Sequence, residues 1–148
     1  MTKRRVISFN SPQAVAEEVK RLRPGCTRAG NWSLPQVCRH LNTAIRFSMR
    51  PGPYEPIAVT PESKSRLAAV LAAGQIPPGI KGPERAIPPQ DTPDGAIDEF
   101  LITLAVLEKF PGPYAPHPFF GEVPTADFAR LHLIHCALHL GHLVPVTE

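Results

Sequence analysis

Four histidines close to the end of the chain have the spacing of one face of an α-helix. His132, His135, His139 and His142 follow one another at intervals of three, four and three residues, which places them within an arc of roughly 80°. The residues between them are mostly apolar, so we expect this helix to be buried against other helices. Four buried imidazoles cannot easily satisfy one another's N–H groups and lone pairs. A divalent metal ion would take lone pairs and leave each N–H for a hydrogen-bond acceptor.

Two of these histidines are the first candidates for ligands of a single ion. His135 and His139 are one helical turn apart, and side chains at that spacing can reach the same ion. His40, in the middle of an earlier helical pattern and on its apolar side, is the candidate for the third ligand. Three histidines with open coordination positions are more typical of a catalytic metal site than of a structural one. Cys136 stands where the H-E-x-x-H protease signature has its glutamate, so peptide hydrolysis of that kind is not supported.

The other interpretation of the histidines is a polar seam inside the core, in which hydrogen bonds to protein groups satisfy each ring. We assign His132 and His142 to such a structural or supporting role. His117, which precedes a proline and two phenylalanines, is interpreted as a turn anchor or as a pocket residue. Trp32 and Phe119 complete the set of candidate pocket residues.

Length and composition indicate one globular domain over residues 1–148. The chain is 43% hydrophobic and 20% charged, and its length allows a sizeable core. Its net charge of +3 is scattered, whereas a nucleic-acid surface would show a denser basic stripe with aromatic side chains, so we expect no nucleic-acid binding. The apolar stretch after the basic start is too short for a secretory signal, and none approaches the ~20 residues of a membrane span. We therefore expect a cytoplasmic protein with no membrane segment.

The three cysteines, Cys26, Cys38 and Cys136, are odd in number and show no C-x-x-C spacing. This pattern favours free thiols in a reducing compartment over a disulfide framework. Cys38 and Cys136 lie next to the candidate ligands in the sequence but point away from them on a helix, so we interpret both as small buried hydrophobes. A redox thiol protein is therefore the weakest of the functional hypotheses.

Five helices are predicted from their start and stop signals. The first begins at Ser11-Pro12 and ends near Arg23, and the second begins at Ser33, which has capping-box spacing to Gln36, and runs to about Met49. A shorter helix runs from Thr60 to Gly74, and a proline-rich loop follows up to Pro93, which we interpret as a lid. A further helix opens at 91–94 and stops before Pro111, and the last runs from a cap at Thr125 through Val144.

Four longer helices, one extra short helix and long proline-rich connections predict an all-α helix bundle. No pair of strands is expected. The connections are long enough for crossovers, so the order of the helices in the bundle is left open.

Two segments of the chain resemble a known family. Residues 32–41 match the pattern W-S-x-x-x-V-x-x-H-L, which is similar to the start of the second helix in DinB-like proteins. The run H-P-F-F-G from His117, followed by L-H-L-I-H-C-A-L-H-L from Leu131, resembles the branch called domain of unknown function 1569. The order of these motifs covers nearly the whole chain, whereas the recognisable residues make up about a third of it.

The resemblance implies a DinB/YfiT-like four-helix bundle, often a homodimer, with a three-histidine site for a divalent ion such as zinc or nickel. The ligands of that site match His40, His135 and His139. Leu140 stands where relatives more often have a histidine or an arginine, and His142 stands where they often have a glutamine. Both differences concern residues that would surround the ligands.

The first functional hypothesis is a metal-dependent transferase, thiol-dependent as in some relatives, or a hydrolase acting on a small molecule. The residue 74–93 loop and the Phe119–Phe120 segment would then exclude solvent from the ion. The second is a non-catalytic bundle that binds a small apolar ligand or a partner protein, with the histidines as a polar seam. Glu99 and Glu108 are expected on polar faces, so no carboxylate is placed to act as a general base beside the seam.

Overall fold

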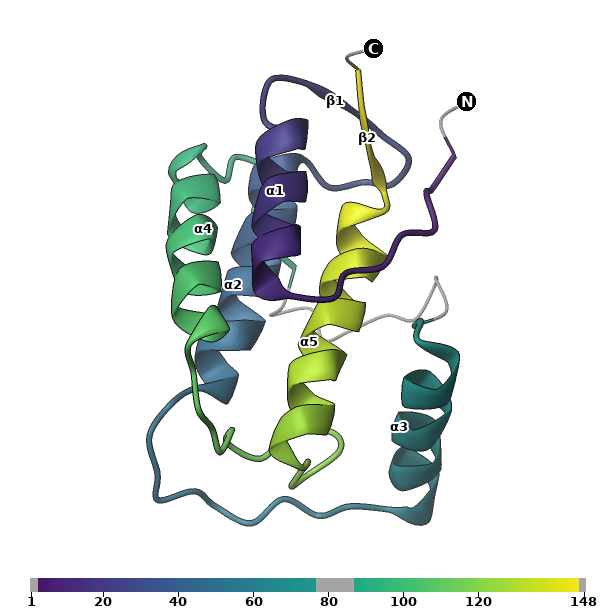
Figure 1. Cartoon of the computed structure of the whole chain (residues 1–148), viewed down its shortest axis with the longest axis vertical. Coiled ribbons are helices and arrows are strands. Elements are labelled where there is room, and N and C mark those ends of the chain that lie inside the picture. Colours follow the sequence, from purple (N-terminus) through teal and green to yellow (C-terminus); the bar gives the residue numbers. More distant parts are fainter. Residues whose placement is uncertain (1–2, 77–86, 147–148) are drawn as a thin grey trace.

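The computed structural model describes residues 3–76 and 87–146, and this part of the chain is mostly helical (Figure 1). Its five helices and two short strands follow in the order α1 (Pro12–Leu22), β1 (Cys26–Arg28), α2 (Leu34–Ser48), α3 (Pro61–Ala73), α4 (Gly95–Glu108), α5 (Thr125–Leu140) and β2 (Leu143–Pro145). The prediction of a largely helical chain is confirmed. None of the helices in the described ranges is long and apolar enough to cross a lipid bilayer.

Three helices begin where their capping residues predict. The Ser11 hydroxyl accepts a hydrogen bond from the Ala14 amide at the start of α1. At α2, the Ser33 amide donates to Gln36 Oε1 over 2.8 Å and the Gln36 amide donates to Ser33 Oγ over 3.3 Å. At α3, the Thr60 and Ser63 side chains each accept a hydrogen bond from the other residue's backbone amide. Because these bonds satisfy amides that the first turn leaves unpaired, they fix the register of each helix, including the helix that carries His40.

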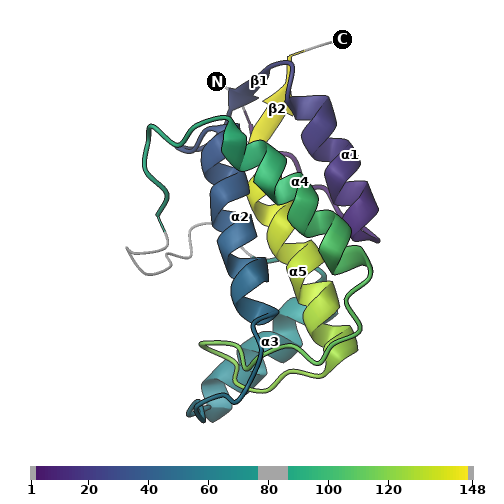
Figure 2. The same cartoon turned by 90° about the vertical axis from the view of Figure 1, so that its left-hand side faces the viewer.

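Helices α1, α2, α4 and α5 pack side by side around the core (Figure 1). Helix α4 contacts both α1 and α2 and lies between them in the view of Figure 2. Helix α3 stands apart from them and contacts α5. Only Ser63 and Val70 of α3 are buried, which explains why this helix lies at the edge. The prediction that this extra helix would be shorter than the other four is wrong, because α3 has 13 residues and α1 has 11.

The predicted end of the last helix is wrong, and so is the absence of strands. Helix α5 stops at Leu140, and β2 pairs antiparallel with β1, Thr27 lying opposite Val144. The N-terminal segment crosses the end of α5, where the Arg5 amide donates to the Gly141 carbonyl over 2.7 Å. A side chain at residue 141 would overlap the Arg5 carbonyl, so glycine permits the crossing. At the other end, Pro124 occupies the capping position predicted for Thr125 and makes no side-chain cap bond.

Part of the residue 74–93 loop lies outside the described residues, which resume at residue 87. Pro88 is buried, and its carbonyl accepts a hydrogen bond from Gln36 Nε2 over 3.1 Å. The described end of the loop is therefore anchored on the first turn of α2.

Candidate metal centre

Three of the predicted site residues meet between α2 and α5. His40 comes from the middle of α2, and His135 and His139 come from successive turns of α5, which packs against α2. The Nε2 atom of His135 lies 3.2 Å from Nε2 of His40 and 3.2 Å from Nε2 of His139. One ring nitrogen of each histidine lies within 4.8 Å of the other two, and all three side chains are partly exposed. We call these residues the histidine trio.

The spacing of the trio fits a metal ion better than it fits hydrogen bonds. Two nitrogens that bind zinc at 2.0–2.1 Å with a tetrahedral angle are about 3.3–3.4 Å apart, close to the observed 3.2 Å. A neutral ring nitrogen is either a donor of one hydrogen or an acceptor, so His135 Nε2 cannot serve both neighbours with good hydrogen bonds. An ion at the centre would accept the lone pairs of all three rings.

Burial keeps two members of the trio, His135 and His139, in the form that binds metals. Burial, together with the neighbouring imidazoles of His139 and His40, holds the pKa of His135 well below its usual value. Burial lowers the pKa of His139 to about 3, with smaller contributions from His40 and His142. Both rings are therefore neutral at pH 7, and a neutral imidazole has the lone pair that a metal requires.

Trp32 packs directly against the trio. Its indole lies 5.3 Å from the His139 ring, centroid to centroid, at an interplanar angle of 14°, which is a stacked arrangement. The same indole lies 5.0 Å from the His40 ring at 56°. The structure therefore brings one of the predicted pocket residues into contact with two of the predicted ligands.

A family model described as "Protein of unknown function (DUF1569)" matches residues 1–146. The chain belongs to the DUF1569 family. Searches of the curated proteins and of the solved structures gave no match. Because the family description assigns no activity, a function for this DUF1569 protein has to be argued from its site.

His132 of the DUF1569 chain lies outside the trio, in the core. Its ring is 4% exposed, and its Nε2 lies 2.8 Å from the Ser48 hydroxyl, which itself donates to the Ile45 carbonyl. His132 Nε2 then carries the hydrogen and donates to Ser48. Tyr114 and Phe128 flank the ring, with centroids at 5.4 and 4.9 Å. Burial, with a smaller contribution from His117, lowers the pKa of His132 to about 3. These contacts are those of a hydrogen-bonded core histidine.

His117 holds a turn, one of the two roles considered for it. Its Nδ1 accepts hydrogen bonds from the Phe119 and Phe120 amides over 3.0 and 3.2 Å, and burial lowers its pKa to about 4. Phe119 is 45% exposed, and its ring contacts Phe120 and the Arg66 guanidinium. His117 and Phe119 therefore lie outside the histidine trio.

His142 does not share a helical face with the other three, because α5 ends two residues before it. Its Nδ1 donates to the Leu138 carbonyl over 3.0 Å.

Within the described residues, the trio is the one group of three or more histidine, cysteine or acidic side chains with metal-binding geometry. The histidine spacing predicts no role for Ser48 or Tyr114, although the place of Ser48 on the buried side of α2 is a signal for a buried hydroxyl.

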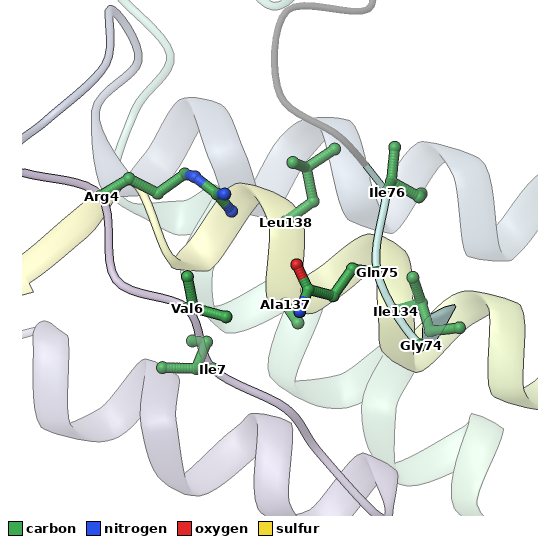
Figure 3. A pocket seen from close by; sticks show the side chains of 9 residues that line it. All are labelled: Arg4, Val6, Ile7, Gly74, Gln75, Ile76, Ile134, Ala137 and Leu138. Carbon is green, nitrogen blue, oxygen red and sulfur yellow. The ribbon is translucent and has the colours of Figure 1, made fainter. Parts of the chain in front are cut away.

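Two pockets lie elsewhere in the described part of the chain, and the trio lines neither of them. Figure 3 shows one between the N-terminal segment, the residues after α3 and one face of α5. Its volume of about 10 Å³ leaves room for about one water molecule. Its lining residues are Arg4, Val6, Ile7, Gly74, Gln75, Ile76, Ile134, Ala137 and Leu138. The other has a volume of about 240 Å³ and lies beside the start of α2, where Ser33 and Leu34 contribute to its wall.

Proposed function

We propose that this DUF1569 protein is a DinB-like four-helix bundle that binds one divalent metal ion, zinc or nickel, through His40, His135 and His139. The observation that carries the proposal is the convergence of three imidazoles: His135 Nε2 lies 3.2 Å from Nε2 of His40 and of His139, close to the separation of two nitrogens that bind one ion, and one ring nitrogen of each histidine lies within 4.8 Å of the other two. The lowered pKa values of His135 and His139 support it, because both rings are free of a proton that would compete with the ion.

The proposed activity is a metal-dependent transfer, thiol-dependent or otherwise, or a hydrolysis that acts on a small molecule. A bound divalent ion would supply Lewis acidity, which lowers the pKa of a water or thiol beside it. Three neutral ligands leave that charge uncompensated and leave coordination positions open. Trp32 packs against the His40 and His139 rings. We include in the proposal the homodimer that the DinB resemblance implies.

The second candidate is a non-catalytic bundle that binds a small apolar ligand or a partner protein. The contact between His132 and Ser48 favours it, since Nε2 of that histidine is paired with a protein hydroxyl. Large apolar side chains on α2 and α4 are also exposed, namely Phe47, Ile102 and Val106. Under this hypothesis the trio is a polar seam in the protein.

The redox-thiol hypothesis loses support. Cys38 and Cys136 are 0% and 1% exposed. Burial raises the pKa of Cys38 to about 12 and raises that of Cys136 as well. Neither thiol forms the reactive thiolate readily at neutral pH.

Metal content tests the proposal most directly. Protein purified without a histidine tag should contain about one zinc or nickel ion per chain by elemental analysis, and a chelator should lower its melting temperature. His135→Ala and His40→Ala should lose the ion because each removes a ligand. His142→Ala is the matched control, since His142 is a partly exposed histidine close to the trio whose ring bonds to a backbone carbonyl. We expect this variant to keep the ion.

Two outcomes of the same experiment would reject the metal site. One is a protein that contains no ion, takes up none on titration and melts at the same temperature with chelator. The other is an equal loss of metal in His142→Ala and His135→Ala. Either result would favour the non-catalytic bundle and direct the search to apolar ligands and partner proteins.

A further inference from the structure

We propose, resting on the proposed metal site, that Trp32 is a positioning residue that holds the His40 and His139 imidazoles in their ligand orientation. The indole contacts both rings, at 5.0 and 5.3 Å between centroids, and is nearly parallel to His139. Those two rings are themselves 4.6 Å apart. Trp32 thus contacts ligands from both helices of the trio.

The backbone around Trp32 is fixed, so its indole can act as a rigid support. Trp32 precedes Ser33, whose reciprocal hydrogen bonds with Gln36 define the start of α2. His40 lies on the same helix, one turn beyond Gln36. The indole is also partly buried against the hydrophobic core. Its position relative to His40 is therefore set by the helix, and its stacking on His139 transmits that position to α5.

The support matters because no protein group in the described residues fixes the rotation of the His139 ring by a hydrogen bond to Nδ1. A histidine ligand generally donates its second ring nitrogen to a carboxylate, carbonyl or water, which fixes the rotation of the ring. Within the described residues, the hydrogen-bond contact of the His139 ring is through Nε2, to His135, and Nδ1 has no protein partner. The ring contacts of His139 are with Trp32, His40 and His135. The stacked indole therefore takes the orienting role that a hydrogen bond has elsewhere.

The test compares a leucine with a phenylalanine at position 32, using Co²⁺ as the probe. Trp32→Leu keeps an apolar side chain but cannot stack, and we expect about a fivefold to tenfold loss of Co²⁺ affinity with a changed visible absorption spectrum. Trp32→Phe should restore most of both. The spectrum reports the coordination of the ion, which a loss of packing alone would not alter. Circular dichroism verifies that each variant is folded, and Trp32→Met replaces the leucine variant if that one is not.

Phe120→Ala is the matched control. It removes an aromatic ring stacked at 4.6 Å on His117, a histidine outside the trio, and should leave Co²⁺ affinity and spectrum unchanged. If the unmodified protein binds Co²⁺ and the leucine or methionine variant has the same affinity and spectrum, the positioning role is overturned while the metal site stands. If the unmodified protein binds no Co²⁺, both proposals fail.

Discussion

At the scale of single residues, the partner of each imidazole decides what that histidine can do. His132 bonds to a serine hydroxyl, His142 to a backbone carbonyl, and His117 to two backbone amides. Each of these rings already has a protein group on one nitrogen. In the trio, the Nε2 atoms of His40 and His139 both face that of His135. Convergence on one point, more than burial or sequence spacing, distinguishes the candidate ligands from the supporting histidines.

Gly121 closes the turn that His117 anchors: the backbones of the two residues exchange hydrogen bonds. Its φ of +72° suits glycine, and a Cβ there would overlap Val59. We expect Gly121→Ala to lower the free energy of unfolding by about 1–3 kcal/mol. Gly95→Ala is the control, since nothing lies within 4 Å of a Cβ at that helical position, and it should be neutral or stabilise by up to about 1 kcal/mol. Urea denaturation measures both. Equal effects would show that the turn tolerates a side chain.

The trio itself was predictable from the sequence, whereas the roles of the remaining histidines were not. Helical periodicity assigns a side chain to a face, and that was sufficient to select His135, His139 and His40. It says nothing about which groups from other elements meet that face. Ser48 is 84 residues from His132 in the chain, so only the packed structure shows that they bond. His142 was assigned to the wrong face because the helix end depends on a distant segment.

At the scale of elements, Arg5 joins the two ends of the described chain. Its guanidinium donates to the Leu143 carbonyl over 2.9 Å and to the Leu140 carbonyl over 3.3 Å, and it pairs with Glu18 of α1 at 2.7 Å. The carbonyls at a helix C-terminus lack intrahelical partners and carry partial negative charge. Arg5 therefore caps the end of α5.

Arg5→Ala should lower the free energy of unfolding by about 2–3 kcal/mol, because it leaves partly buried carbonyls without a donor. Arg21→Ala is a matched control, since Arg21 pairs with the same Glu18 at 3.3 Å but is 59% exposed. Exposed pairs of this kind contribute about 0–1 kcal/mol. Thermal and urea denaturation of the two variants give the comparison. Similar losses in both would mean that the ion pair with Glu18, and not the helix cap, carries the effect of Arg5.

The helix starts were predictable from the sequence, whereas the end of α5 and the pairing of β1 with β2 were not. Helix starts depend on residues three apart, so Ser11, Ser33 and Thr60 were sufficient to place α1, α2 and α3. The end of α5 and the β1–β2 pair depend on Arg5 and on strands of three residues each, more than 100 residues apart in the chain. No local pattern predicts such a pairing. Gly141 was the available signal, as a glycine directly after the last apolar position of the helix.

At the scale of the whole molecule, buried neutral histidines couple stability to pH. His132 has a pKa of about 3 in the folded protein, because it is buried, against about 6.5 when unfolded. The unfolded chain therefore binds the extra proton first as pH falls. The stability that this group contributes is complete above pH 6.5 and is lost as pH falls from 6.5 toward 3. The residues around it, Ser48, Tyr114, Phe128 and His117, offer no negative charge that would oppose this loss.

His132→Gln should therefore flatten the acid side of the stability curve. The slope of the free energy of unfolding between pH 6 and 4 should decrease by about 1.4 kcal/mol per pH unit, the effect of one proton. The variant is compared with the unmodified protein by urea denaturation at each pH, in the presence of a chelator, because metal binding also releases protons. At pH 8 the two proteins differ only through packing and the hydrogen bond to Ser48, so that difference serves as the baseline. Parallel curves from pH 8 to pH 4 would mean that His132 takes up its proton equally in the folded and unfolded chains, which would place it in contact with solvent and not in the core.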